Sequence, residues 1–349
     1  MRTVLVTGGC GFIASHFIRL LLQRTEWRIV NLDKLTYAGR LENLPDLAEG
    51  PRYRFVRGDI ADRAQADILF REERPWGIVN FAAESHVDRS ILDSAPFLLT
   101  NVIGVQTLLE AARRHGIERF LQISTDEVYG DAAARDPFSE ESPLSPSSPY
   151  AASKAAADLL CLAYRRTYGL PTLIVRSSNN YGPRQFPEKL IPLMIRSALR
   201  EDELPIYGDG LQCRDWLYVE DNAEAILAVL ERGRVGAIYN VAADEERSNL
   251  VVVEAICELL GARLRVNPEA FLARLRHVKE RPGHDRRYAI TTCRIREELG
   301  WAPRVSFADG LARTVGWFLQ YRDSFTPVAA EDYRLYCEAI YARSWEHSP

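Results

Sequence analysis

A short apolar strand that runs into a glycine-rich turn and then into a helix opens this chain, and it constrains the fold more than any other feature. Residues 1–7 are rich in β-branched side chains, Gly8-Gly9-Cys10-Gly11 follows, and Phe17, Leu20 and Leu21 then recur at helical spacing. Strand, glycine turn and helix in this order form a phosphate-binding unit, because glycine lets the backbone approach a diphosphate closely. The pattern predicts a parallel α/β sheet that binds a dinucleotide.

An acidic residue ends the next predicted strand. Residues 27–32 are mostly apolar, and Asp33 follows them. A carboxylate at this distance from the glycine turn accepts hydrogen bonds from the adenosine ribose and would repel the 2′-phosphate of NADP. The glycine run alone is equally compatible with a structural turn, but together with Asp33 it predicts NAD as the cofactor.

The alternation of strands and helices continues far along the chain. Apolar runs at 55–60, 77–83, 120–123 and 172–176 read as strands, helices are predicted over 101–115 and 150–168, and 237–241 is expected to rejoin the sheet. The predicted fold is therefore a Rossmann-type doubly wound parallel sheet. Within it Asp59 and Ile60 are placed to flank the adenine, and Ala82 and Ala83 let the backbone approach the cofactor.

The strict alternation stops after Ser178, which predicts a smaller C-terminal α/β domain that binds substrate. We assign 1–178, with about 215–242, to the NAD-binding domain, and 179–214 with 243–325 to the substrate domain. Residues 326–349 are expected to pack on the body as a tail. Within the smaller domain, 190–200 is a predicted helix, 205–210 a turn, and Ser248 a helix cap.

Two adjacent carboxyl groups lie just after the predicted strand 120–123. Thr125, Asp126 and Glu127 are then at the carboxyl end of the sheet, where open α/β sheets bind ligands. Like charges in a poorly solvated site raise one pKa and leave the other group ionised. One of the two carboxyls can thus donate a proton while the other removes one.

Tyr150 and Lys154 form a second reactive pair. They stand four residues apart in a segment of strong helix formers, so both side chains project from the same helix face. We expect the ammonium group to lower the pKa of the phenol, which is about 10 when unperturbed. The pair can then exchange a proton at a substrate hydroxyl.

Composition excludes several classes of partner. The net charge is −4 and the six cysteines include no Cys-x-x-Cys pair, so neither nucleic acid, nor a metal site, nor a disulfide framework is indicated. The N-terminus has no secretory h-region, and no uninterrupted apolar run approaches the ~18 residues of a membrane span. These features predict a cytoplasmic protein without a membrane segment.

Positive charge is concentrated in the turn at 281–288. Arg281 and His284 lie there, and together with Arg214 they form a candidate anion site, since guanidinium groups match diphosphate oxygens. His86 is left between two interpretations, a hydrogen-bonded loop residue or a substrate contact. The carboxylates of the loop at 132–149, among them Glu140, are expected to be solvated.

Several of these segments together resemble one family. The chain is similar to the dTDP-glucose 4,6-dehydratases, which are extended short-chain dehydrogenases/reductases, and the likeness reaches about Arg322. The Tyr150/Lys154 pair marks the superfamily and the Asp126-Glu127 pair marks the dehydratases. One difference is Ala14, which stands where the glycine run of the family usually ends in Gly. The matching segments are Thr7-Gly8-Gly9-Cys10-Gly11-Phe12-Ile13, Asp33-Lys34-Leu35-Thr36-Tyr37-Ala38-Gly39, Phe81-Ala82-Ala83-Glu84-Ser85-His86-Val87-Asp88, Ser124-Thr125-Asp126-Glu127-Val128-Tyr129-Gly130, Ser178-Asn179-Asn180-Tyr181-Gly182-Pro183 and 281–289.

The resemblance implies a set of site residues. The implied catalytic residues are Thr125, Asp126, Glu127, Tyr150 and Lys154. The implied NAD contacts are Gly8, Gly11, Phe12, Ile13, Asp33, Lys34, Thr36, Asp59, Ile60, Phe81, Ala82, Ala83, Ser85, Thr100, Tyr150, Lys154 and Asn180. The implied substrate contacts are Ser85, His86, Thr125, Asn179, Lys189, Leu190, Pro205, Ile206, Tyr207, Arg214, Asn249, Arg281 and His284.

The resemblance also implies a reaction: oxidation of dTDP-glucose at C4, loss of water across C5 and C6, and reduction at C6, which gives dTDP-4-keto-6-deoxyglucose. A nucleotide-sugar 4-epimerase or glucuronate decarboxylase needs no acid and base at C6 and C5, so the Asp126-Glu127 pair disfavours both. A non-catalytic NAD-binding scaffold is disfavoured by the intact reactive residues. The choice between thymidine and uridine stays open. The helices beginning at Asn101 and Tyr150 are expected to pair with a second subunit in a homodimer.

Overall fold

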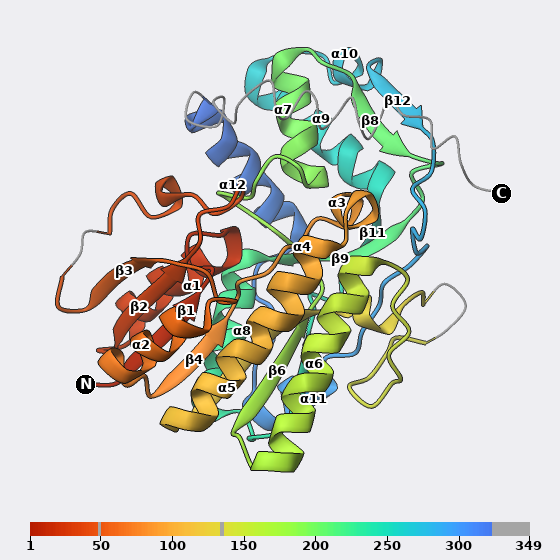
Figure 1. The fold of residues 1–349 in the computed structure, drawn as a ribbon. Coiled ribbons are helices and arrows are strands. Elements are labelled where there is room, and N and C mark those ends of the chain that lie inside the picture. Colours follow the sequence, from red (N-terminus) through yellow and green to blue (C-terminus); the bar gives the residue numbers. More distant parts are fainter. Residues whose placement is uncertain (48–49, 133–135, 323–349) are drawn as a thin grey trace.

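A seven-stranded parallel sheet crosses the centre of the molecule, in the order β10-β6-β5-β4-β1-β2-β3 (Figure 1). The computed structural model describes residues 1–47, 50–132 and 136–322, so the predicted tail 326–349 lies outside the described residues. The Rossmann-type sheet is confirmed, and 237–241 rejoins it as β10. The strands are β1 Thr3–Thr7, β2 Arg28–Asp33, β3 Tyr53–Arg57, β4 Gly77–Asn80, β5 Arg119–Thr125, β6 Thr172–Ser177 and β10 Ile238–Val241.

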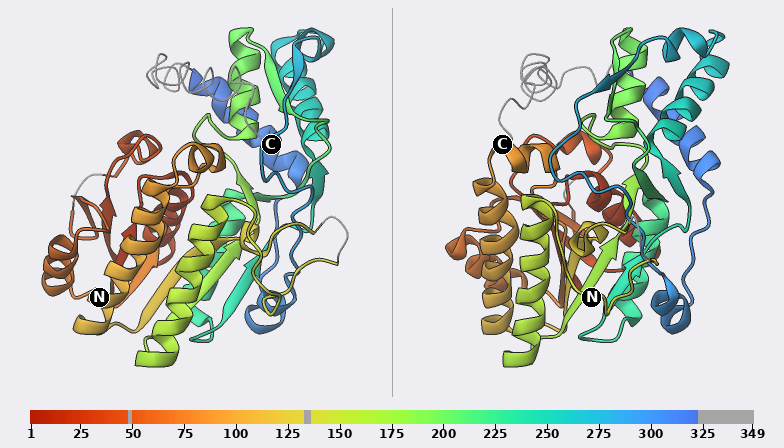
Figure 2. Two further views of the ribbon diagram at one scale, coloured as in Figure 1. Left: turned by 45° about the vertical axis from the view of Figure 1, so that its right-hand side comes forward. Right: turned by 90° about the vertical axis from the view of Figure 1, so that its right-hand side faces the viewer.

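Helices cover both faces of this sheet (Figures 1 and 2). One face carries α1, α8 and α11, and the other carries α2, α5 and α6, each over its own apolar core. Strand β1 supplies both cores, because Val4 and Val6 point to one face and Leu5 to the other. The helices are α1 Phe12–Arg24, α2 Arg63–Glu73, α5 Val105–His115, α6 Pro149–Tyr168, α8 Val219–Arg232 and α11 Cys293–Leu299. The chain changes direction between β1 and β4, which makes the carboxyl ends of these strands the expected ligand crevice.

The C-terminal region has its own core, formed where α7, α9 and α12 pack on two small sheets. Its elements are β7 Asn179–Tyr181, α7 Leu190–Arg200, β8 Leu204–Tyr207, β9 Cys213–Tyr218, β11 Glu246–Ser248, α9 Asn249–Leu264, α10 Glu269–Leu272, β12 Leu275–Val278 and α12 Phe307–Gln320.

Two sequence-based assignments differ from the structure in this region. The predicted turn at 205–210 was wrong in its first half, because 204–207 is strand β8, which pairs with β12; only Gly208-Asp209-Gly210 turns. Strand β9, part of which we grouped with the NAD-binding domain, pairs with β7 and β11 and not with the large sheet. Both misreadings concern pairings between segments distant in sequence, which local patterns do not reveal.

The helix expected over 101–115 begins earlier. Short helices α3 Val87–Leu92 and α4 Ala95–Phe97 lead into a π-helical stretch, η2 Leu98–Gly104, that continues directly into α5. By length and hydropathy alone, Ala95–His115 would be long and apolar enough to cross a membrane, contrary to our reading of the sequence, but half of the tested window is buried inside the protein. One such helix is weak evidence for a membrane span, and here it packs against α6.

Local signals set the ends of the helices that matter most for the site. Ser148 caps α6 by accepting a hydrogen bond from the Ala151 N–H at 3.1 Å, Pro149 occupies the first turn, and Gly169 ends the helix with a φ of 69°. Ser248 caps α9 as predicted. The expectation of a solvated Glu140 was wrong: its carboxylate is buried and accepts the Asn240 backbone N–H at 3.0 Å.

Candidate active site

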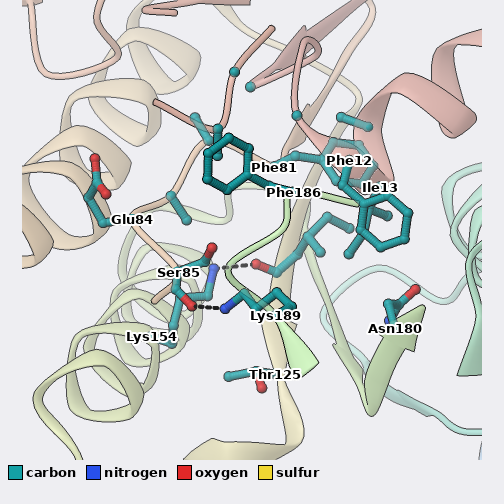
Figure 3. A pocket seen from close by; sticks show the side chains of 18 of the residues that line it. Phe12, Ile13, Phe81, Glu84, Ser85, Thr125, Lys154, Asn180, Phe186 and Lys189 are labelled. Atoms are coloured by element: carbon teal, nitrogen blue, oxygen red, sulfur yellow. Dashed lines mark hydrogen bonds between the residues drawn. The ribbon is translucent and has the colours of Figure 1, made fainter. Parts of the chain in front are cut away.

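A cavity of about 350 Å³ lies at the carboxyl ends of β1, β4 and β5, and continues toward the segment that precedes α7. Every residue that we predicted to contact NAD lines it, as do all five predicted catalytic residues. Figure 3 shows the aromatic rings of Phe12, Phe81 and Phe186 gathered in one part of it, while Lys154 and Thr125 lie in another. Among the residues described, no cluster of ligating side chains could hold a metal ion.

The glycine turn forms a close backbone cradle. Gly8 has a φ of 66°, and a Cβ at this position would lie 2.7 Å from backbone atoms of Ala82. Helix α1 then starts after Gly11, which offers no side chain to cap the first helical N–H groups. These groups and the positive end of the helix dipole suit a diphosphate. Ala14 is buried beside this turn, and its methyl group is accommodated.

Asp33, which we predicted to bind the ribose, is held by two backbone N–H groups. Its carboxylate accepts the Cys10 N–H at 2.8 Å and the Leu35 N–H at 2.7 Å, and it is almost fully buried. Burial raises the pKa of this carboxyl, and the two backbone hydrogen bonds oppose the rise. Next to it, Lys34 pairs with Asp59 at 2.6 Å.

The predicted acid–base pair sits where β5 ends. Thr125 caps a short helical turn, η3 Asp126–Tyr129, by accepting the Glu127 N–H at 3.3 Å, and its hydroxyl donates to Asp126 Oδ1 at 3.2 Å. The strand end and the turn therefore fix both carboxyls in the cavity wall.

The two carboxyls have different surroundings. Burial, and then the charge of Glu127, raise the pKa of Asp126 to about 8, and Asp126 Oδ2 has no hydrogen-bond partner among the described residues. Burial also raises the pKa of Glu127, but Arg281, Lys189 and Arg214 oppose that rise. These surroundings favour the protonated form of Asp126, and the three cations favour the ionised form of Glu127.

Tyr150 and Lys154 enter the same cavity from α6, and both are buried. Lys154 Nζ donates to the Ile123 carbonyl of β5 at 2.5 Å (Figure 3), and burial lowers its pKa to about 8. The expected lowering of the Tyr150 pKa is not found. Burial and the carboxylates of Glu127 and Asp126 raise that pKa, because the sequence spacing did not reveal how near these acids would be.

The predicted substrate residues divide into two groups. Ser85, Thr125, Asn179, Lys189 and Leu190 line the cavity, and Lys189 Nζ donates to the Ser85 carbonyl at 2.7 Å (Figure 3). The residues outside the lining are His86, Pro205, Ile206, Tyr207, Arg214, Asn249, Arg281 and His284.

Three members of this outer group, Tyr207, Arg281 and His284, lie around Asp88, which the sequence reading did not select. Its buried carboxylate accepts the Tyr207 hydroxyl at 3.1 Å and Arg281 at 3.0 Å, so α3 is joined to the C-terminal region. His284 packs its ring against Tyr207 and contacts Glu280 through Nδ1 at 2.6 Å. Burial lowers the pKa of His284 to about 2, so this ring is neutral.

The remaining members of the outer group have other partners. Arg214 lies over the Tyr288 ring at 4.1 Å and donates to the Asp285 carbonyl at 2.9 Å. The side chain of Ile206 belongs to the C-terminal core. The Asn249 N–H bonds the Gln212 carbonyl at 3.0 Å at the start of α9. Pro205 is half-buried in β8.

His86 makes the hydrogen-bonded loop contact that one of its two interpretations predicts. Its Nε2 lies 3.3 Å from the Glu188 carbonyl, the side chain is buried, and burial lowers the pKa of the imidazole to about 3. It supports the loop and does not line the cavity.

The segment 185–189 supplies residues that sequence reasoning missed. Gln185, Phe186 and Glu188 line the cavity, and the Tyr37 hydroxyl donates to Glu188 Oε1 at 3.2 Å. Only their position in the sequence could have identified these residues, since they lie between the predicted site residues Asn180 and Lys189. Trp216, on β9, also lines the cavity and was missed because no motif marks it in the sequence.

Comparison with known proteins extends over almost the whole chain. The family described as "GDP-mannose 4,6 dehydratase" matches residues 5–314. The dTDP-glucose 4,6-dehydratase of Neisseria meningitidis serogroup B is 49% identical, with 96% of this chain and 98% of the relative covered. That of Salmonella typhimurium is 46% identical, with 97% and 98% covered.

Solved structures agree in fold. DesIV, a dTDP-glucose 4,6-dehydratase from Streptomyces venezuelae with NAD and TYD bound, has a TM-score of 0.87 at 46% identity, with 93% of this chain and 99% of DesIV covered. The UDP-glucose 4-epimerase of Thermotoga maritima has a TM-score of 0.83 at 28% identity, with 92% and 99% covered. The sequence thus resembles the dehydratases more closely than this epimerase on the same fold. A cavity that combines a dinucleotide turn, a Tyr-Lys pair and an Asp-Glu pair, on a chain of such similarity, means that the chain belongs to the dTDP-glucose 4,6-dehydratase family.

Proposed function

We propose that this chain converts dTDP-glucose to dTDP-4-keto-6-deoxyglucose with NAD as a returning hydride carrier, as a hydro-lyase. The observation that carries the proposal is that Tyr150 and Lys154 share one cavity with Asp126 and Glu127. The first pair suits oxidation of a hydroxyl, and the second suits elimination next to the carbonyl that this oxidation creates.

The residues of the cavity fit NAD. The Gly8 turn and the start of α1 suit the diphosphate, Asp33 suits the ribose, and Asp59 and Ile60, which line the cavity, would flank the adenine. The other predicted cofactor residues complete the lining around them. When bound, NAD supplies a hydride acceptor for C4 and later a hydride donor for C6.

Tyr150 and Lys154 act on the sugar 4-hydroxyl. Tyr150 removes the hydroxyl proton while the C4 hydride departs, and Lys154 stabilises the phenolate that this step requires. Thr125, whose hydroxyl lines the same wall, is placed to hydrogen-bond the 4-oxygen. The result is a 4-ketone.

Asp126 and Glu127 act next. The ketone acidifies the C5 hydrogen, so Glu127 removes it as a base, and Asp126 gives its proton to the departing 6-hydroxyl, which leaves as water. After hydride reaches C6, Glu127 returns a proton to C5. The surroundings that favour the protonated form of Asp126 and the cations that face Glu127 support these roles.

The C-terminal region is proposed to hold the nucleoside diphosphate. Lys189, Arg214 and Arg281 supply positive charge near Glu127, and Asn179 Oδ1 is a buried acceptor without a partner among the described residues. Residues 1–178 with about 219–242 then serve as the NAD-binding domain, and 179–218 with 243–325 as the substrate domain, because β9 packs in the small sheet.

The test is product analysis of dTDP-glucose incubated with purified protein in deuterated water. We expect bound NAD in the purified protein, loss of one water from the substrate, and deuterium at C5. A product that keeps its 6-hydroxyl would instead identify an epimerase.

We further propose a homodimer in a reducing cytoplasm. The pair formed by η2–α5 and α6 lies side by side on the outside of the molecule (Figure 2) and exposes large apolar side chains at about half of their area. Leu98, Leu99 and Ile103 project from η2, and Leu159 from α6. An apolar patch of this kind suits a second copy of the same helices. The described cysteines are free, which suits a reducing compartment.

A further inference from the structure

A chain of buried polar side chains runs from α6, which carries Tyr150 and Lys154, to the turn η3, which carries Asp126 and Glu127, and its members do not line the cavity. Arg176, on β6, donates from Nε to Asp158 Oδ2 at 2.8 Å and from a terminal nitrogen to the Tyr129 hydroxyl at 2.7 Å. The Tyr129 hydroxyl in turn donates to Asn240 Oδ1 at 2.8 Å. Asp158, Arg176, Tyr129 and Asn240 each have at most 2% of their surface exposed.

This arrangement is costly in a protein interior. Removing an arginine and a carboxylate from water carries a desolvation penalty that their attraction often fails to offset, and apolar replacements of similar volume are frequently as stable. Arg176 is nevertheless among the largest fully buried side chains of the described residues. Such a pair is therefore weak evidence for stability and points to a role in placing other groups.

One end of the chain acts on Lys154. Asp158 lies four residues after Lys154 on the same face of α6, and its charge raises the Lys154 pKa against the lowering by burial. The other titratable group that acts on this amine is Cys161, also on α6. Other elements contribute less to the pKa of the Lys154 amine. Strand β5 offers it the Ile123 carbonyl, and Arg176 of β6 is paired with Asp158. The charges of Asp126 and Glu127 on η3 act on Tyr150.

The other end holds the turn that bears the acid–base pair. Tyr129 is the last residue of η3, two positions after Glu127. Its ring stacks on Phe138 at 5.4 Å and lies under the Arg176 guanidinium at 4.7 Å. Asn240, on β10, accepts from the Tyr129 hydroxyl and is anchored by Glu140 through its own backbone N–H. The turn is thus fixed from β6 and from β10 at once.

We propose that Asp158, Arg176 and Tyr129 are positioning residues that couple the two halves of the reaction. Asp158 keeps Lys154 charged for the oxidation at C4, and Arg176 with Tyr129 holds the Asp126-Glu127 turn at the C5 and C6 atoms. This inference rests on the proposed function and deepens it.

The first test isolates the oxidation at C4. Rapid mixing of the NAD-loaded protein with dTDP-glucose, followed by absorbance of reduced nicotinamide, gives the rate of the first hydride transfer as a function of pH. In Asp158→Asn we expect the alkaline limb of this profile to move about one pH unit lower, because Lys154 loses its proton more readily. Asp158→Glu, which keeps the carboxylate, should return the alkaline limb most of the way to its position in the unmodified protein.

The matched control is Asp221→Asn, which alters a buried carboxylate that accepts the N–H groups of Arg304 and Val305 away from the cavity. Its profile should stay that of the unmodified protein. An Asp158→Asn profile that coincides with this control would overturn the role of Asp158.

The second test isolates the elimination, and it uses a milder change that keeps the ring. In Tyr129→Phe we expect the first hydride transfer within about twofold of normal and the exchange of deuterium into C5 slower by roughly 10- to 100-fold, since a small displacement of a catalytic group has effects of this size. Reduced nicotinamide should accumulate. Tyr239→Phe, which removes a buried hydroxyl bonded to Glu298 at 2.6 Å, is the control and should change neither step.

Equal slowing of both steps in Tyr129→Phe, or no slowing, would overturn the positioning of the turn. Failure of the proposed function is distinguishable, because the unmodified protein would then release no water from dTDP-glucose, whereas failure of the inference leaves that turnover intact.

Discussion

The two ends of the cavity differ in how their residues reach it. At the nucleotide end, all predicted residues line the wall, and most belong to turns that directly follow a strand of the large sheet. At the substrate end, Tyr207, Arg281 and His284 stand outside the lining and are organised by Asp88 from another region. The comparison teaches that strand ends position a cofactor site through the backbone. A substrate site formed by two regions depends instead on contacts between side chains that are distant in sequence.

The largest expected effect comes from Tyr150→Phe, which removes the phenol that is proposed to accept the 4-hydroxyl proton. Without the phenol the 4-hydroxyl proton has no acceptor, so we expect kcat to fall about 10³-fold. The NAD content of the purified protein should be unchanged, because the nucleotide end keeps its backbone contacts. Steady-state turnover and cofactor analysis measure both quantities, and a loss of only twofold would contradict the assigned base.

Glu127→Gln should separate the two chemical stages. Oxidation at C4 needs no base at C5, so we expect reduced nicotinamide to form and persist while product formation falls about 10²-fold. Absorbance of the enzyme after mixing with dTDP-glucose checks this outcome. Unchanged turnover would refute the role given to Glu127.

Arg281→Ala tests the substrate end of the cavity. Loss of a charged hydrogen-bonding group typically weakens binding by about 1.5–3 kcal/mol, so KM for dTDP-glucose should rise roughly 10- to 100-fold while NAD content stays normal. Arg287→Ala is the matched control, since its guanidinium pairs with Glu246 on the surface. Similar KM values for the two variants would remove Arg281 from the diphosphate site.

The pH dependence should show the protonated state of Asp126. Its pKa is raised to about 8, so the group holds its proton below that value and loses it as the pH rises through 8. In single-turnover reactions, the rate at which the reduced nicotinamide disappears again reports the loss of water after oxidation at C4, and this rate should therefore fall toward tenfold per pH unit above pH 8. The same limb should be absent in Asp126→Asn, whose remaining activity is low at every pH.

The smallest effect on chemistry is expected from Leu159→Arg combined with Ile103→Arg on the outer helices. Two buried charges would oppose the proposed pairing, so sedimentation should show a monomer, with kcat within a few-fold of normal because neither of the two side chains lines the cavity. Leu264→Arg, at another exposed apolar position on α9, should leave the oligomeric state unchanged. A double variant that sediments as the unmodified protein does would exclude this interface.

Much of the fold follows from local pattern. The helix 190–200 and the caps at Ser148 and Ser248 form where the sequence places such signals, and the parallel strands follow the apolar runs. Strand β8 was misread because Pro205 and Gly208 suggest a turn, while its pairing with β12 involves a segment about seventy residues away.

The residues of the site were predictable where sequence motifs identify them. Their pKa values were less predictable, because these depend on burial. The spacing of Tyr150 and Lys154 is correct, but their pKa values depend on Glu127, Asp126 and Asp158, whose approach only the packed structure defines. Glu140 likewise looked like a surface acid and became an internal anchor. Charge alone therefore says little about solvation.

Asp88 has a consequence for recombination between relatives. One region of the protein contributes this carboxylate, and the other contributes both of its donors, Tyr207 and Arg281. A chimaera with a C-terminal half from another relative, if that half lacks matching donors, would leave the buried Asp88 carboxylate unpaired between the two regions. Exchange of nucleotide specificity by grafting thus has to transfer this three-residue contact as a unit.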